Sequence, residues 1–360
     1  MSLEQRLKVE IRENGPIGVD VFMARCLHDP EFGYYSTRPA LGPDGDFITA
    51  PLVSQMFGEL AGLWAVEVWA RLGAPSPFLL VEMGPGDGTL ITDVLRAAHV
   101  RPAFLDAARL ILIETSAPFR AAQQARLTRA GASATWIERL DQLPPGPMVL
   151  LANEVLDCLP AVQFVRTETG WLERLIGLDD EGELCFGLAP GPPGVGPAGD
   201  IVAFDASPGQ VVEVSPTQRA LGAQVGGRIC DQGGCALFID YGRDRREAGD
   251  TLQALMRHAK VDPLRTAGKA DLTVWADFPS FMSGARSGGA ASSGPAPQGL
   301  WLKRLGIDTR GQALARSAPD RAEVIARQRA RLVDPDQMGE LFKVAAIHEP
   351  GFIPPGFEEP

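Results

Sequence analysis

The sequence has few of the residues that build metal centres or covalent cross-links. It contains five cysteines, no two of them in a CxxC spacing, and only four histidines scattered over 360 residues. Zinc sites and disulfide frameworks need such residues in clusters or in paired spacings. We therefore expect no metal site, and we expect a reducing compartment.

The chain also lacks an excess of basic residues and any apolar run of membrane-spanning length. Lys and Arg number 34 against 45 Asp and Glu, which gives a net charge of −11 at pH 7. An acidic chain has little bulk affinity for the phosphate backbone, so general nucleic-acid binding is not expected. The beginning, MSLEQRLKVEIRENG, has no apolar segment, and its acidic residues argue against a transit peptide. These features predict a cytoplasmic protein that does not insert into a membrane.

What the sequence does have is a change of pattern near residue 76. Before it, helical patterns cover 3–13, 17–27 and 53–73, and the last two are separated by a loop rich in Gly, Pro and aromatic residues. After it, apolar segments alternate with amphipathic helices. The predicted strands are 78–84, 109–116, 134–140 (a short strand or a turn), 147–155, 235–242 and 341–350, and the predicted helices are 89–98 and 118–130. Strands that are apolar throughout indicate a parallel sheet covered by helices on both faces, hence an α/β fold.

Other segments interrupt this pattern. Residues 162–189 alternate around glycine turns, which predicts antiparallel hairpins inserted into the core. The runs at 191–199 and 283–299 are rich in Gly, Ser and Pro and predict loops, the second on an exposed lip outside the core. The predicted division is a helical cap with an active-site loop (1–75), the first part of the core (76–160), a β-hairpin/helix insertion (161–230), and the completion of the core (231–360) with a variable substrate-side lip at about 262–320.

The stretch LLVEMGPGDGTL, residues 79–90, combines an apolar strand ending at Glu82 with Gly84, Gly86 and Gly88. No Lys follows as in a triphosphate-binding loop, and a dinucleotide-binding GxGxxG would need glycine where Thr89 stands. GxGxG after an acid-bearing strand is instead typical of class I S-adenosyl-L-methionine-dependent methyltransferases. The glycines allow close backbone approach, and the helix N-terminus at Thr89 can meet a carboxylate. The alternative is a plain strand-to-helix turn.

Acidic residues also end two later strands. Glu114 follows the second strand, where its carboxylate can accept hydrogen bonds from both ribose hydroxyls. The fourth strand ends in ANEVLD, which places Asn153, Glu154 and Asp157 at the edge where parallel sheets bind ligands. Paired carboxylates suit a cationic acceptor such as a guanidinium. The alternatives are that Asp157 caps the next turn and that Glu154 is solvated.

From about residue 14 to the terminal FKVAAI, the chain resembles the MidA-like methyltransferases. The motifs that carry the resemblance are GPIGVDVFMARCLHDPEFGYYS, GDFITAPLVSQMFGEL, VEMGPGDGTL, IETS, ANEVLDCLPAVQFV, VEVSP, IDYG and DPLRTAGKADLTVWADF. This family comprises the bacterial and mitochondrial relatives of a complex I assembly factor that symmetrically dimethylates an arginine of a complex I subunit. The resemblance implies a class I Rossmann sheet with a helical N-terminal cap and inserted β-hairpin and helical segments.

The resemblance also implies roles for individual residues. Gly84, Gly86, Gly88 and Glu114 would form the S-adenosyl-L-methionine site, Asp46 and Thr49 would lie on a loop over it, and Gln55 would open the helix behind; Asn153 and Glu154 would face donor and acceptor. Two positions depart from the family pattern: Leu52 replaces a glutamate and Asp87 replaces an arginine.

The implied function is protein-arginine methylation, with a respiratory complex I subunit or its bacterial equivalent as substrate. Two alternatives stay open. One is a methyltransferase for another acceptor, a small molecule or RNA; the other is a catalytically weak assembly or binding protein that keeps the fold. A homodimer is compatible with the sequence.

Overall fold

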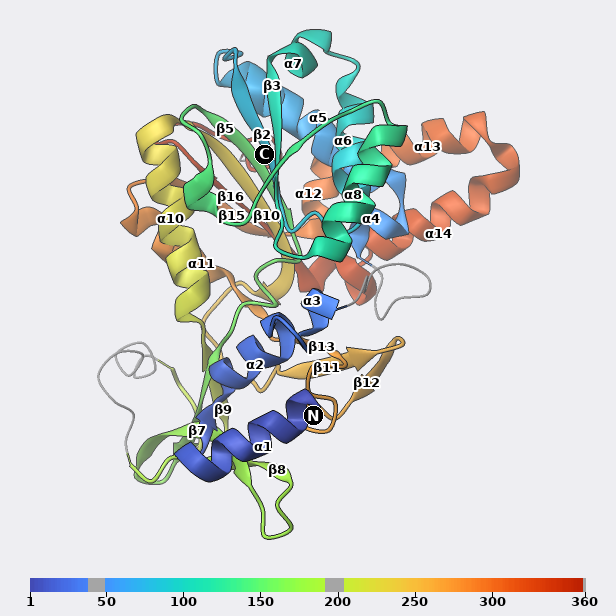
Figure 1. Ribbon diagram of the computed structural model, residues 1–360. Helices are drawn as coiled ribbons and strands as arrows, with labels where there is room; N and C mark the ends of the chain where they lie inside the picture. The colour runs from blue at the N-terminus through green and yellow to red at the C-terminus, as the bar shows by residue number, and fades with distance from the viewer. Residues whose placement is uncertain (38–48, 192–203, 359–360) are drawn as a thin grey trace.

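The computed structural model describes residues 1–37, 49–191 and 204–358. A mostly parallel sheet fills the upper lobe in Figure 1, with strand order β15-β16-β10-β5-β2-β3-β4 and β14 paired to β10. β10, β5, β2, β3 and β4 run parallel to one another, whereas β16 and β15 add an antiparallel edge. The bounds are β2 Phe78–Met83, β3 Ala108–Ile113, β4 Thr135–Ile137, β5 Met148–Asn153, β10 Gly234–Arg243, β14 Ala276–Asp277, β15 Ala291–Pro297 and β16 Phe342–His348. The predicted α/β class is confirmed.

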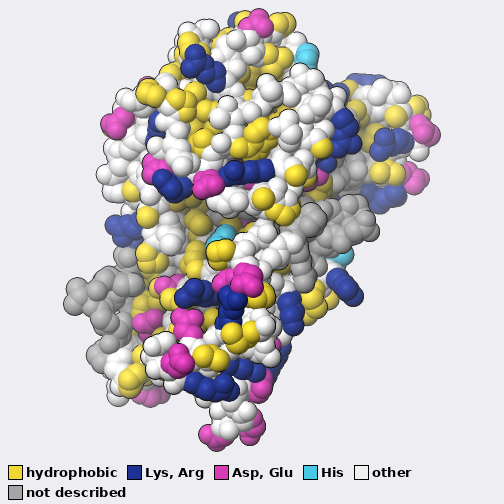
Figure 2. Space-filling model, viewed as in Figure 1, with side chains coloured by type: hydrophobic (Ala, Val, Ile, Leu, Met, Phe, Trp, Pro, Cys, Tyr) yellow, Lys and Arg dark blue, Asp and Glu magenta, His cyan; other side chains and the backbone are white. Residues whose placement is uncertain are grey.

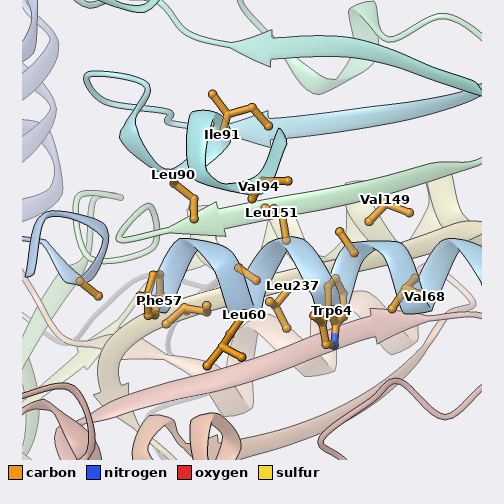
Figure 3. Close-up of a cluster of buried hydrophobic side chains, with 14 of the residues drawn as sticks. Phe57, Leu60, Trp64, Val68, Leu90, Ile91, Val94, Val149, Leu151 and Leu237 are labelled. Atoms are coloured by element: carbon orange, nitrogen blue, oxygen red, sulfur yellow. The ribbon is translucent and has the colours of Figure 1, made fainter. Parts of the chain in front are cut away.

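Helices cover both faces of this sheet, which explains why its central strands are apolar throughout. On one face, Phe57, Leu60 and Trp64 of α5 pack between the sheet and its neighbouring helices, with Val94 of α6 and Leu151 of β5 close by (Figure 3). Each fully buried side chain of this size contributes about 1.5–3 kcal/mol. The helices of this face are α5 Gln55–Arg71, α6 Thr89–Ala98, α7 Pro102–Ala107, α12 Gln298–Arg304, α13 Ile307–Ser317 and α14 Ala322–Val333.

The opposite face is covered by α10 (Pro216–Gln232) and α11 (Phe278–Ser287), which pack closely on each other. The predicted exposed loop over 283–299 is therefore wrong: its first part ends α11, and its second part is β15, which pairs with β16. A Cβ on Gly226 would lie 2.2 Å from the carbonyl oxygen of Ala285, so the small residues serve close helix packing. The prolines of β15 are tolerated because the strand lies at the sheet edge.

The lower lobe in Figure 1 joins the N-terminal helices to two small sheets. One sheet has the order β1-β7-β6-β9 with β8 paired to β7, and the other has the order β12-β11-β13. Both are antiparallel, and β6, β7 and β8 of the first sheet confirm the hairpins predicted over 162–189. The bounds are α1 Leu3–Asn14, β1 Ile17–Gly18, α2 Val19–His28, α3 Tyr34–Thr37, β6 Val162–Thr167, β7 Gly170–Leu178, β8 Leu184–Leu188, β9 Val211–Val214, β11 Gln253–Met256, β12 Ala259–Val261 and β13 Asp271–Thr273.

The division of the chain into domains stays a prediction. α5 lies within the predicted cap (1–75), and all but the last two residues of α10 lie within the predicted insertion (161–230); both helices pack on the central sheet. Of the predicted loop 191–199, only residue 191 lies within the described ranges. The remaining elements are α4 Ala50–Val53, α8 Ala117–Arg129 and the short helical turns η1 Leu140–Gln142, η2 Pro319–Arg321 and η3 Pro335–Gly339. Within the described ranges, every helix is too short or too polar to cross a bilayer.

Candidate functional site

A cavity lies at the carboxyl ends of β2, β3 and β5 and is lined by residues of both lobes. Parallel sheets bind ligands at this edge because the loops that follow the strands diverge there. Its walls come from the glycine loop and strand ends of the core, and from His28 and Tyr35 of the lower lobe. Eight predicted residues line it: Thr49, Glu82, Gly84, Gly86, Thr89, Glu114, Asn153 and Glu154.

The glycine loop adopts a backbone that few other residues could form. Gly84, Gly86 and Gly88 have φ values of +64°, +52° and +81°, in the left-handed region that glycine enters without steric cost. A Cβ on Gly84 would also lie 2.8 Å from a methyl carbon of Val155. The positive φ values favour glycine at all three positions, and the close approach of Val155 restricts Gly84 further.

Asp87, which departs from the family pattern, is held by contacts with the start of α6 and with α8. Its Oδ1 accepts a hydrogen bond of 2.9 Å from the Thr89 N–H at the start of α6. Arg126 of α8 donates to the Asp87 carbonyl oxygen at 3.0 Å and pairs with its carboxylate. The Thr89 hydroxyl is buried and has no partner in the described part of the chain. The helix start thus offers an unused polar atom to a ligand.

Glu82 is a carboxyl group buried at the end of β2. Burial raises its pKa to about 8, and repulsion from Asp87 and Glu114 acts in the same direction. Its Oε2 is buried without a partner among the described residues. A cationic group bound beside it would supply the missing contact and favour the ionised form.

Glu114, at the end of β3, is held by donors from the following turn and from α8. Its Oε1 accepts from the Ser116 N–H at 2.8 Å, and its Oε2 accepts from the Gln123 amide at 3.1 Å. Burial raises the pKa of Glu114, while these donors oppose the rise. Both carboxylate oxygens keep further acceptor capacity. Gln123 was missed by the sequence reasoning, although it interrupts the buried stripe of Phe119 and Leu127 on α8.

Asn153 is the last residue of β5, and Glu154 follows it in a strained turn. Glu154 has a φ of +54°, an uncommon conformation for a residue with a side chain. Its Oε1 accepts from Asn153 Nδ2 at 2.9 Å and from the Ala50 N–H at 3.4 Å. Burial, followed by repulsion from Asp157, raises the pKa of Glu154 to about 8. Asn153 Oδ1 is buried without a partner in the described ranges, so this turn presents two acceptor groups to the cavity.

Asp157 does not line the cavity, in contrast to its predicted catalytic place. Its buried carboxylate accepts a hydrogen bond of 2.6 Å from the Tyr241 hydroxyl, and burial raises its pKa to about 6. The backbone N–H groups of Asp157 and Cys158 also contact this carboxylate and oppose the rise of its pKa. Asp240, a fully buried residue of β10, accepts from the Leu156 and Asp157 N–H groups at 2.8 and 3.1 Å. Asp240 was missed, though it directly follows the apolar run of β10, as the predicted acids follow the apolar runs of their strands.

The residues predicted around the cavity rim have different outcomes. Thr49 lines the cavity where α4 begins. Gln55 is exposed on α5, donates to Glu59 at 3.4 Å and does not reach the cavity. Asp46 lies outside the described residues. Tyr35, which the sequence reasoning did not select, lines the cavity and donates to Asp271 at 2.7 Å.

The polar groups that line the cavity suit a ligand that is both cationic and rich in hydroxyl groups. Three buried atoms that have no partner among the described residues belong to residues that line the cavity: Glu82 Oε2, Thr89 Oγ1 and Asn153 Oδ1. Two of the lining carboxyls have pKa values raised to about 8, so a positive charge would be accommodated by their ionisation. Within the described ranges, no group of three His, Cys, Asp or Glu side chains is placed to hold a metal ion.

Comparisons with known proteins agree with this chemistry. A family model described as "Putative S-adenosyl-L-methionine-dependent methyltransferase" matches residues 60–296. The mitochondrial protein arginine methyltransferase NDUFAF7 homolog of Drosophila melanogaster is 36% identical over 98% of this chain and 86% of its own. The NDUFAF7 protein of Rattus norvegicus is 34% identical over 95% of this chain and 83% of its own. A crystal structure of a Burkholderia thailandensis protein bound to S-adenosyl-homocysteine covers 99% of this chain and 92% of that one, with 27% identity and a TM-score of 0.85.

Proposed function

The chain belongs to the family of S-adenosyl-L-methionine-dependent methyltransferases, and we propose that its acceptor is an arginine side chain in a protein. The observation that carries this proposal is the turn after β5, where Asn153 and Glu154 present two acceptor groups beside the glycine loop. The names of the relatives support the same acceptor. Symmetric dimethylation of a respiratory complex I subunit or its bacterial equivalent is part of the proposal, as the sequence resemblance implies.

The residues of the glycine loop and the two strand ends fit the methyl donor. S-adenosyl-L-methionine, when bound, supplies an electrophilic methyl group on a sulfonium. The glycines would let the backbone approach the ligand, and the N-terminus of α6 at Thr89 would meet its carboxylate. Glu114 would accept from the ribose hydroxyls, and Glu82 would face positive charge of the donor. The unpartnered atoms Glu82 Oε2 and Thr89 Oγ1 support this placement.

The acceptor would be held by one carboxylate and one amide oxygen. Asn153 Nδ2 and the Ala50 N–H both engage Oε1 of Glu154, which leaves Glu154 Oε2 and Asn153 Oδ1 for the guanidinium. Two acceptors side by side match the planar fork of that group. An arriving cation lowers the pKa of Glu154 and ionises it, because the attraction offsets part of the desolvation. The guanidine nitrogen must lose a proton as it is methylated, and Glu154 Oε2 is the proposed proton acceptor.

This arrangement replaces the predicted pair of Glu154 and Asp157. The Asp157 carboxylate accepts a hydrogen bond from the Tyr241 hydroxyl and does not line the cavity. Its effect on the acceptor would therefore be electrostatic, without direct contact. RNA as the acceptor has little support: on the face shown in Figure 2, acidic and basic side chains are intermixed. A cytoplasmic location and a homodimer stay predictions from the sequence.

The proposal is tested by labelling. Purified protein is incubated with methyl-tritiated donor and a lysate, and labelled proteins are examined by mass spectrometry for symmetric dimethylarginine. We expect Glu154→Gln to bind S-adenosylhomocysteine normally but to transfer no label, and Glu114→Ala to bind it weakly. Label that appears only in nucleic acid or small molecules would overturn the arginine acceptor. Tight binding without any transfer would favour the assembly-protein alternative.

A further inference from the structure

Gln123 on α8 connects two parts of the donor site that lie far apart in the sequence. Its side chain is fully buried, and its amide nitrogen donates to the Gly86 carbonyl oxygen at 2.7 Å and to Glu114 Oε2 at 3.1 Å. Its amide oxygen accepts from the indole N–H of Trp136 at 2.7 Å. One amide therefore touches the glycine loop, the carboxylate after β3, and β4.

The partners fix the orientation of this amide. The indole N–H of Trp136 can only donate, so it selects the amide oxygen. The carbonyl oxygen of Gly86 only accepts, and Glu114 Oε2 accepts here, so these two oxygens take the two hydrogens of the amide nitrogen. Because both hydrogens and the oxygen are used, a flipped amide would lose all three bonds at once. The group is fully satisfied and has a single favourable orientation.

The position of Gln123 on its helix shows that these bonds are the reason for a polar residue there. α8 buries Phe119, Gln123 and Leu127, which are spaced four residues apart on one face. An amide between two apolar side chains is unfavourable unless its hydrogen bonds are made. Helix packing alone would be served by an apolar residue of similar length.

Glu114 depends on this amide for the placement of one oxygen. The backbone N–H of Ser116 holds Oε1 through the local turn, whereas Oε2 is held from α8 by Gln123. The same nitrogen holds the glycine loop at Gly86. A shift of the amide would therefore change the separation between the loop and the ribose-facing carboxylate.

We propose that Gln123 is a positioning residue for the methyl donor, because it holds Glu114 and the glycine loop at a fixed separation. The inference rests on the donor site of the proposed function. The inference predicts that Gln123 chiefly affects the binding of the ribose hydroxyls, because Glu114 would accept hydrogen bonds from these groups. Trp136 acts one step further out, through the orientation of the amide.

The test combines variants with a ligand that lacks the relevant contact. Binding of S-adenosylhomocysteine and of its 2′-deoxy analogue is measured by calorimetry for the wild type, Gln123→Met, Gln123→Glu and Trp136→Phe. Gln124→Glu is the control, since Gln124 lies on the exposed side of the same helix. We expect Gln123→Met to weaken the binding of S-adenosylhomocysteine about 10- to 100-fold, which is the range for the loss of a hydrogen bond to a charged group. Gln123→Glu should weaken it further, because it sets a carboxylate against Glu114.

The 2′-deoxy analogue separates positioning from a general loss of structure. For this ligand we expect a much smaller effect of Gln123→Met, because the wild type has already lost a hydroxyl contact. Trp136→Phe should give the same selective pattern with a smaller factor. The inference would be overturned if Gln123→Met and Trp136→Phe weakened the binding of both ligands equally, or if both variants bound both ligands normally. Either result would leave the proposed function intact. A wild type that binds neither ligand would overturn both.

Discussion

Replacing Glu82 by glutamine should stabilise the free protein at alkaline pH and weaken donor binding. Glu82 is 2% exposed, and its Oε2 has no partner among the described residues. Burial raises its pKa from 4.5 to about 8, with repulsion from Asp87 and Glu114 in the same direction. Glutamine has nearly the same shape and no charge. The substitution therefore removes the cost of charging a buried carboxyl and changes little else in the packing.

The size of the effect follows from linkage between protonation and folding. A carboxyl whose pKa is raised on folding keeps its proton in the native state between pH 4.5 and about 8, where the unfolded chain releases it. The free energy of unfolding therefore falls as pH rises through this window, by about 1.4 kcal/mol per pH unit well inside it. Between pH 6 and pH 8 the wild type loses about 2 kcal/mol through Glu82, and the Glu82→Gln variant is free of this loss.

Urea unfolding of both proteins at pH 6 and pH 8 measures this difference. Glu154, whose pKa is also raised to about 8, titrates in both proteins, so it cancels in the comparison. We expect the stability of the variant relative to the wild type to increase by about 2 kcal/mol from pH 6 to pH 8. S-adenosylhomocysteine should bind the variant more weakly at pH 8. A relative stability that is the same at both pH values would refute the reasoning.

Three further substitutions test the packing, the core ion pair and the loop. Gly226→Ala, which sets a Cβ 2.2 Å from a carbonyl oxygen of the facing helix, should cost about 1–3 kcal/mol in urea unfolding, whereas Gly227→Ala, whose Cβ would meet nothing closer than 3.9 Å, should not destabilise. Glu213→Gln leaves a buried arginine unpaired and should cost about 3–5 kcal/mol, against about 0–1 kcal/mol for Glu247→Gln in an exposed pair. Gly84→Ala forces a side chain to a φ of +64°, which should cost about 1–2 kcal/mol and weaken S-adenosylhomocysteine in calorimetry. Equal effects within the glycine pair or the glutamate pair, or normal ligand binding by Gly84→Ala, would contradict these assignments.

The central strands could be predicted because burial on both faces leaves a simple pattern in the sequence. The predicted strand over 78–84 is observed as Phe78–Met83, and every residue of it is buried. The predicted strand over 147–155 is observed as Met148–Asn153, with only its last residue less than fully buried. A continuous apolar run bounded by turn residues is sufficient to locate such strands, and their alternation with helices is sufficient for the α/β class.

The segment 283–299 could not be predicted because small residues have two opposite uses. In a linker, glycine and serine leave the chain free; between helices, they allow backbones to touch. The carbonyl oxygen of Arg219 would lie 2.1 Å from a Cβ on Gly284, so this glycine belongs to the second kind. Composition is the same in both situations, and only the facing helix, about 60 residues earlier in the chain, distinguishes them.

The positions of some site residues follow from the local sequence, whereas those of others depend on distant parts of the chain. Glu82, Glu114 and Glu154 reach one cavity because each stands at the carboxyl end of a parallel strand, a position that sequence alone specifies. Asp157 follows only three residues after Glu154, yet the turn directs it to Tyr241 instead of the cavity. Gln55 faces outward because helix rotation decides which side of α5 it occupies.

Asp87 shows why a departure from a family pattern has to be interpreted together with its contacts. Considered alone, an acid in place of a basic residue beside the donor loop changes the local charge. In the structure, the guanidinium of Arg126 pairs with this carboxylate and donates to the Asp87 carbonyl oxygen, while the carboxylate also accepts from the N–H of Thr89. The acid is thus neutralised by a neighbouring helix and orders the start of α6. Arg126 lies three residues after Gln123 on α8, so two residues about one turn apart on one helix hold the glycine loop. Because Arg126 pairs with the acid and also holds the loop through the Asp87 carbonyl oxygen, the exchange of charge at position 87 is compatible with an intact donor site.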